Sequence, residues 1–194
     1  GGAGLSILPI VPPTLQGPAV SQNEFFGMMN GGNLDYEKAA NSGVGTARVN
    51  MMWYLSNNPT GGTPNWTAQD EMFKKFAKSG IRVIPTFYGN RVGGPENMLI
   101  SSGAWKEYQK YIGLAVDRYG PGGNYWKENP DVPYVPVRAW EVWNEPNFSI
   151  NNPGGKYVYP KLYAQILVRA SRTIKKRDPA AIVLFGGLAN PSSN

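Results

Sequence analysis

Short apolar runs alternate with amphipathic segments along most of the chain. The apolar runs occupy residues 25–30, 46–55, 81–88, 135–144 and 182–190. Between them, residues 34–43, 67–78, 104–120 and 160–179 place apolar side chains at the spacing of one helix face. Runs of one kind alternating with the other are typical of βαβ units, so the pattern predicts an α/β fold built on a parallel sheet.

Four of the predicted helix ends carry local signals. Helix 34–43 ends on Gly43, and helix 104–120 ends on Gly120. Pro160 stands at a first-turn position, where its missing N–H costs nothing. Thr67 and Asp70 form a capping-box pattern at the start of the second helix.

The segments that follow the apolar runs differ from those that precede them. They are long and rich in Gly, Asn and aromatic residues, whereas most returns from helix to strand are short. This asymmetry predicts a functional site at the carboxyl ends of the strands, as in barrels and doubly wound sheets. Residues 1–23 read as an extended Gly- and Pro-rich lead-in, and residues 24–194 read as a single α/β domain.

Composition narrows the chemistry. The chain has 194 residues, of which 41% are hydrophobic, enough for the core of about one domain. It contains neither cysteine nor histidine. The absence of both excludes Ser-His-Asp and Cys-His nucleophilic systems, HExxH zinc sites and zinc fingers. Acid-base chemistry therefore falls to Asp, Glu, Tyr or Lys, and we expect no metal.

Charge and motifs argue against nucleic-acid and membrane partners. The net charge is +6, but basic residues cluster only at 169–177, the end of a predicted helix, where cations complement the helix dipole. No apolar run reaches the roughly 18 residues that a membrane span needs. The first strand-to-helix turn reads NGGNLD rather than GxGxxG, and no phosphate-binding P-loop occurs. The Gly, Pro, Asn and Trp content without cysteine suggests an extracellular or periplasmic location.

The fourth apolar run ends in the sequence AWEVWNEPN, residues 139–147. Asn144, Glu145 and Pro146 fit poorly inside a sheet, and a carboxylate flanked by tryptophans at a strand end indicates a site. WNEPN in this place resembles the acid/base motif of the clan A retaining glycoside hydrolases, a group of (β/α)8 TIM barrels with cellulase-like and β-xylosidase-like members. In the same order, GVGTARVNMMW resembles their second strand, SGIRVIPTFYGN the third and DPAAIVLFGGLAN the fifth.

The resemblance covers roughly residues 24–190 and implies roles for named residues. Glu145 would be the general acid and base, Asn144 would bind the sugar 2-hydroxyl, and Arg48 would support the nucleophile electrostatically. A contact to the 2-hydroxyl that strengthens in the transition state lowers the barrier. Further contacts to a carbohydrate substrate are expected from Trp53, Tyr88, Trp143, Asn50 and Asn147. No cofactor is implied.

Alternatives remain open for most of these residues. Glu145 could instead cap the following loop, and Arg48 could be a structural partner of the inward-pointing Glu141. The rings that could stack on a sugar suit the core equally well; they are Trp53, Trp143, Tyr88 and Trp66. The aromatic residues on predicted helices or returning loops are expected in the core or at the surface; they are Trp105, Tyr108, Tyr111 and Trp126.

The sequence contains no evident nucleophile. A retaining enzyme needs two carboxyl groups about 5 to 5.5 Å apart, and Glu141 lies roughly 13 Å from Glu145 along an extended strand. The family's nucleophile is a glutamate at the end of the seventh strand, and at this spacing eight βα units would need more than about 300 residues. We therefore expect about five of eight units, completed by a C-terminal remainder as a second chain or fragment. The other hypothesis is a non-catalytic half-barrel that binds carbohydrate or a partner chain.

Overall fold

One parallel sheet organises the chain. The computed structural model describes residues 26–29, 34–52, 63–88, 102–148 and 160–190, so the predicted lead-in at 1–23 lies outside it. These residues contain five strands, which are β1 (Gly27–Met29), β2 (Thr46–Met52), β3 (Arg82–Tyr88), β4 (Ala139–Val142) and β5 (Ile182–Phe185). Their order in the sheet is β1-β2-β3-β4-β5, and every pairing is parallel. The predicted α/β class is confirmed, and the sequential order fits the five consecutive βα units expected from the sequence.

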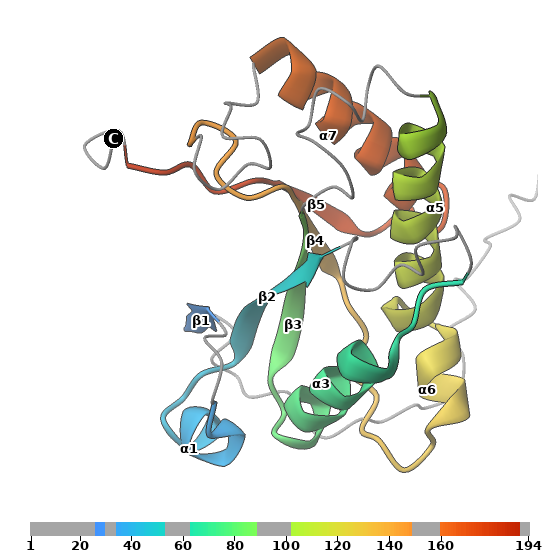
Figure 1. The fold of residues 1–194 in the computed structure, drawn as a ribbon. Helices are drawn as coiled ribbons and strands as arrows, with labels where there is room; N and C mark the ends of the chain where they lie inside the picture. The colour runs from blue at the N-terminus through green and yellow to red at the C-terminus, as the bar shows by residue number, and fades with distance from the viewer. Residues whose placement is uncertain (1–25, 30–33, 53–62, 89–101, 149–159, 191–194) are drawn as a thin grey trace, which may run out of the picture.

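The helices lie mostly on one side of that sheet. They are α1 (Tyr36–Asn41), α3 (Thr67–Lys78), α5 (Ser102–Tyr119), α6 (Asn124–Glu128) and α7 (Pro160–Lys175). Figure 1 shows α3, α5, α6 and α7 gathered beside one face of the sheet, while the opposite face is not covered by any of the labelled helices. Among the described residues, no helix is long and apolar enough to cross a membrane.

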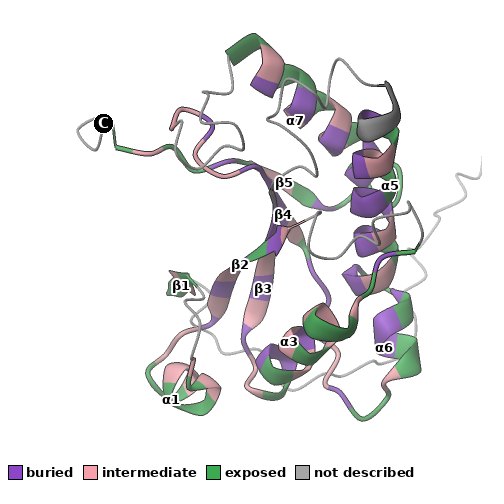
Figure 2. Ribbon diagram, in the orientation of Figure 1, coloured by how far each residue is buried: buried purple, intermediate pink, exposed green. Residues whose placement is uncertain are grey.

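The two faces of the sheet have different chemistry. Along β2, Ala47, Val49 and Met51 are buried against the helices, whereas Arg48 is only partly buried and Asn50 is exposed. Successive side chains of a strand point to opposite faces, so Arg48 and Asn50 belong to the uncovered face. Figure 2 shows that the buried residues are concentrated in the central strands and in the helices beside the sheet.

Aromatic rings fill the core between the sheet and the helices. Phe87 stacks on Trp140 with ring centroids 5.3 Å apart, and Phe73 stacks on Tyr119 at 3.9 Å. The four helix and loop aromatics Trp105, Tyr108, Tyr111 and Trp126 are all buried, as expected. Trp66 is partly buried and stacks on Tyr111 at 5.4 Å, which favours a packing role for it.

The capping-box prediction at the start of α3 is wrong. Trp66 is the N-cap residue, with no side-chain cap, and Asn65 accepts a hydrogen bond from the Thr67 N–H at 3.0 Å. Asp70 instead accepts two hydrogen bonds from Arg118, at 2.8 and 2.6 Å, and one from the Tyr119 hydroxyl at 2.6 Å. A guanidinium fork supplied by a distant helix binds the carboxylate more strongly than a single backbone N–H would.

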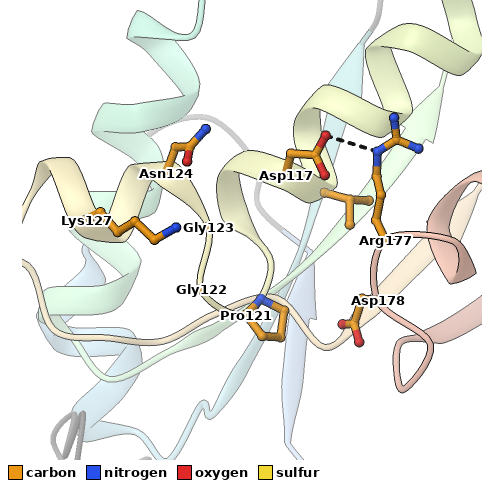
Figure 3. A pocket seen from close by; sticks show the side chains of 9 residues that line it. Asp117, Pro121, Gly122, Gly123, Asn124, Lys127, Arg177 and Asp178 are labelled. Carbon is orange, nitrogen blue, oxygen red and sulfur yellow. Dashed lines mark hydrogen bonds and ion pairs between the residues drawn. The ribbon is translucent and has the colours of Figure 1, made fainter. Parts of the chain in front are cut away.

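The basic end of α7 is held by packing and one ion pair. Arg177 lies 3.0 Å from the Asp117 carboxylate, and the Arg169 guanidinium lies 5.1 Å from the centre of the Trp105 ring. Figure 3 shows the Arg177 and Asp117 pair at the rim of a polar pocket of about 260 Å³, which Lys127 and Asp178 also line. These contacts agree with the reading of this basic stretch as a solvated helix end.

Candidate active site

The chain leaves β4 by an unusual backbone path. Trp143 has φ 75° and Glu145 has φ 43°, values in the left-handed region that side chains disfavour. Two hydrogen bonds hold this path: the Trp143 N–H donates to the Phe87 carbonyl, and the Glu145 N–H donates to the Gly187 carbonyl, both at 2.9 Å. Backbone strain of this kind costs about 1 to 3 kcal/mol per residue and gathers at functional sites. It places Glu145 at the carboxyl end of the sheet, beside the exit of β5.

A glycine allows the exits of β4 and β5 to touch. A Cβ on Gly186 would lie 2.7 Å from the Trp143 carbonyl oxygen and 2.9 Å from that of Val142, closer than real contacts allow. The Gly186 N–H donates to the Tyr163 hydroxyl at 2.7 Å, and that hydroxyl donates to the Val142 carbonyl at 2.8 Å. Burial, together with the negative charge of Glu141, raises the pKa of Tyr163 to about 12, so the bridging hydroxyl keeps its proton.

Glu141 is the centre of the polar network on the uncovered face. Its side chain accepts hydrogen bonds from Arg48 Nε and from Arg48 Nη2, the latter at 3.1 Å. It also accepts from the Thr86 hydroxyl at 2.7 Å and from the Gly187 N–H at 2.9 Å. Thr86 is its direct neighbour on β3 in the sheet register.

The environment of Glu141 favours the charged form. Burial alone would raise the pKa of this carboxyl. The hydrogen bonds from Arg48, from the Gly187 N–H and from Thr86 together outweigh burial, so the pKa lies below its usual value. Glu141 is thus a buried carboxylate paired with a cation.

Arg48 joins this network to the predicted acid/base loop. Its Nη2 also donates to Asn144 Oδ1 at 2.8 Å, so one guanidinium contacts both Glu141 and Asn144. The alternative raised from the sequence, that Arg48 is a structural partner of Glu141, is therefore confirmed. Its predicted electrostatic support of a nucleophile stays a prediction.

The predicted sugar-contact residues fall into different environments. The Trp143 ring is fully buried, which favours the core alternative for it. Asn147 donates to the Ala189 carbonyl and accepts from the Ala189 N–H, both at 2.9 Å, and so ties the β4 exit to the β5 exit. Asn50 is exposed on the uncovered face, in register with Thr86. Tyr88 ends β3 but its side chain is not described, and Trp53 lies outside the described residues.

From the sequence, Glu141 was expected as a possible partner of Arg48 and was rejected as the nucleophile because of its distance from Glu145. Thr86, Gly186 and Gly187 were not expected at the site. The register that pairs Thr86 with Glu141 is a tertiary property, which the sequence does not carry. The available signal was the Gly186-Gly187 pair directly after β5, because adjacent glycines at a strand exit often mark a close backbone approach.

Comparison with known proteins identifies the fold. No protein-family model matches the chain, and no curated protein matches its sequence. Among solved structures, it is similar to a glucosidase from Croceicoccus marinus, with a TM-score of 0.57 and 19% identity over 80% of this chain. It is also similar to a family 39 glycoside hydrolase from Bacteroides cellulosilyticus WH2, with a TM-score of 0.54 and 18% identity over 84% of this chain. An endoglucanase from Pseudomonas stutzeri gives a TM-score of 0.55 and 14% identity over 79% of this chain.

The chain has the fold of part of a (β/α)8 barrel, the fold that it shares with those structures. It spans 33%, 31% and 42% of the lengths of those three structures, respectively. A likeness at this level of identity establishes the arrangement of strands and helices. The five sequential strands of the described residues account for a partial barrel, as the repeat length predicted.

The contact at Gly186 provides a matched pair of substitutions. A Cβ on Gly187 would have Glu141 Oε1 as its nearest neighbour, at an ordinary 3.7 Å. Gly186→Ala should therefore lower the free energy of unfolding by about 1 to 3 kcal/mol through overpacking, and Gly187→Ala should change it by less than about 0.5 kcal/mol. Urea unfolding of both variants checks this. Equal losses would contradict the close approach of the two strand exits.

The lowered pKa of Glu141 predicts a pH dependence of stability. As the pH falls below about 4.5, this carboxyl takes up a proton in the unfolded chain but stays charged in the folded chain, whose pKa is lower. The contribution of Glu141 to stability therefore decreases as the pH falls toward the folded-state pKa. Glu141→Gln lacks this titration. The difference in unfolding free energy between wild type and variant should thus shrink between about pH 6 and pH 3, measured by urea unfolding. A difference that stays constant over this range would contradict the prediction.

Proposed function

We propose that this chain carries the acid/base half of a retaining β-glycosidase that acts on a poly- or oligosaccharide outside the cytoplasm. One observation carries the proposal: Glu145 and Asn144 follow the fourth strand of a sequential parallel sheet whose fold is that of (β/α)8 glycoside hydrolases. In such folds the chemistry takes place at the carboxyl ends of the strands. The proposal needs no cofactor.

The proposed reaction has two steps. In the first, a carboxylate nucleophile attacks the anomeric carbon while Glu145 donates its proton to the departing glycosidic oxygen, so that the C–O bond breaks and a glycosyl ester forms. In the second, Glu145 takes a proton from water, whose oxygen attacks the same carbon and releases the nucleophile. Asn144 binds the sugar 2-hydroxyl in both transition states. Asn50, Tyr88, Trp53 and Asn147 remain proposed substrate contacts, whereas the fully buried Trp143 ring is assigned to the core.

Glu141 does not suit the role of nucleophile. Both of its oxygens already accept hydrogen bonds, two from Arg48, one from Thr86 and one from Gly187. Attack on a sugar would require breaking several of these contacts. The nucleophile therefore comes, in this proposal, from βα units that follow the fifth, in the same chain or in a second one.

An apolar surface at β5 supports the existence of such a partner. Val168, Ile182 and Phe185 are 46%, 57% and 54% exposed. A groove of about 470 Å³ between α7 and β5 is lined by Leu167, Val168, Val183 and Phe185, among others. An edge strand beside an apolar groove invites pairing with another strand and helix. We propose that the remainder of the barrel covers this surface.

Substrates with different leaving groups test the role of Glu145. In the catalytically complete protein, Glu145→Ala should slow glycosides with poor leaving groups by about 10² to 10⁴-fold. Activated aryl glycosides need little protonation and should show a much smaller loss in the first step. Azide should then accelerate turnover and yield a glycosyl azide of retained configuration. The control Glu128→Ala changes an exposed glutamate on α6 and should leave both rates near wild type.

Two outcomes would remove Glu145 from the acid/base role. One is an equal loss on both substrate types, and the other is the absence of any azide product. Hydrolysis of β-glycosides by the 194-residue chain as a monomer would overturn the proposal that further βα units supply the nucleophile.

The apolar surface predicts self-association of the 194-residue chain when no partner is present. Val168→Asp introduces a charge into the groove and should shift the sedimentation profile toward monomer at micromolar concentration. The control Ala68→Asp makes the same kind of change at an exposed position of α3 and should leave the profile unchanged. A wild-type chain that is monomeric throughout would contradict an uncovered association surface.

A further inference from the structure

Glu141 has no part in the proposed chemistry, yet it lies at the centre of the candidate site. The residue is only 5% exposed and sits on the uncovered face of β4, four residues before Glu145. Three different strands or strand exits donate to it, through Arg48 on β2, Thr86 on β3 and Gly187 after β5. A carboxylate held this firmly has a structural or a positioning role.

The contact between Arg48 and Asn144 fixes the orientation of the Asn144 amide. A guanidinium carries only donors, so the Asn144 atom that faces Arg48 must be the carbonyl oxygen. The Nδ2 group then points away from Arg48, and within the described part of the chain it donates to no protein acceptor. Asn144 therefore offers a ligand hydrogen-bond donors, whereas an amide of free orientation could offer either a donor or an acceptor.

Glu141 in turn fixes Arg48. Its Oε2 accepts from Arg48 Nε and Thr86, and its Oε1 accepts from Arg48 Nη2 and Gly187. Because both oxygens face the guanidinium, a glutamine at this position would present an NH₂ group to one Arg48 donor in either orientation. If the NH₂ group replaces Oε2, it can donate to the Thr86 hydroxyl, and only the contact with Arg48 Nε is lost. If it replaces Oε1, it faces the Gly187 N–H, which cannot accept. The first orientation is therefore the better one.

We propose that Glu141 is a positioning residue: through Arg48 it holds the Asn144 amide as a fixed hydrogen-bond donor and so selects a sugar that bears an acceptor oxygen at carbon 2. The inference rests on the proposed glycosidase function for its substrate class. The geometry on which it depends, a chain of three side chains from Glu141 to Asn144, is a property of the folded protein itself.

Paired substrates distinguish positioning from a merely structural role. In the catalytically complete protein, Glu141→Gln should lower kcat/KM for a 2-hydroxy glycoside by about 10 to 100-fold, the effect of losing or misaligning a charge-assisted contact. The matching 2-deoxy glycoside cannot use Asn144 and should change by less than about threefold. Asn144→Ala should produce the same loss of selectivity for the 2-hydroxy glycoside. The variant that combines Glu141→Gln with Asn144→Ala should lose no more of this selectivity than either single variant does.

Two further variants serve as a control and a second test. Glu128→Gln, an isosteric change at an exposed glutamate, should leave the selectivity for the 2-hydroxy substrate unaltered. Arg48→Lys keeps the positive charge but removes the planar fork, and it should reduce that selectivity as Glu141→Gln does. Equal loss on the 2-hydroxy and 2-deoxy substrates, in both Glu141→Gln and Arg48→Lys, would overturn the positioning role.

A spectroscopic measurement separates this inference from the proposed function. In ¹⁵N-labelled protein, Glu141→Gln should shift the Arg48 Nε–H and Asn144 Nδ2 resonances, whereas Glu128→Gln should move neither. If both resonances shift while no glycoside is hydrolysed, the positioning geometry stands and the glycosidase proposal fails. If the Asn144 resonance does not respond to Glu141→Gln, the positioning role is overturned whatever the activity.

Discussion

The buried ion pair between Arg48 and Glu141 is the interaction on which the candidate site depends. Their side chains are 23% and 7% exposed, so both charges are partly removed from water, and only close pairing and additional hydrogen bonds offset that cost. Thr86 and the Gly187 N–H supply those bonds. The pair thereby links β2, β3, β4 and the exit of β5 on one face of the sheet. Removing either partner would leave an uncompensated charge at the site.

The second constraint is the backbone path by which β4 ends. The left-handed conformations of Trp143 and Glu145 stop the alternation of the strand, bury the Trp143 ring and place Glu145 beside Gly187. Gly186 permits this because a side chain there would collide with the β4 carbonyls. The ion pair and the strand exits support one another, since Gly187 takes part in both. Strain at Glu145 is thus held by contacts outside its own segment.

The sequence predicted the arrangement of strands better than it predicted the site. Alternating apolar and amphipathic segments predict βα units and a parallel sheet, because each unit is local along the chain, and the structure shows that the strand order is sequential. The capping box at Asp70 failed because Arg118, a distant residue, binds that carboxylate. α6 was not predicted because its five residues are too few to show a helical period. The central role of Glu141 follows from the register between strands, and the burial of the Trp143 ring follows from the positive φ of that residue. Neither the register nor this φ can be predicted from the neighbouring sequence.

The central claim is that the end of β4 presents an acid/base glutamate to a nucleophile supplied by a further part of the barrel. Covalent trapping with a 2-deoxy-2-fluoro glycoside, followed by peptide mass spectrometry of the catalytically complete protein, tests it most directly. The reagent stabilises the glycosyl ester of the first step and marks the nucleophile. We expect the label on a glutamate outside these 194 residues. A label on Glu145 or Glu141 would contradict it.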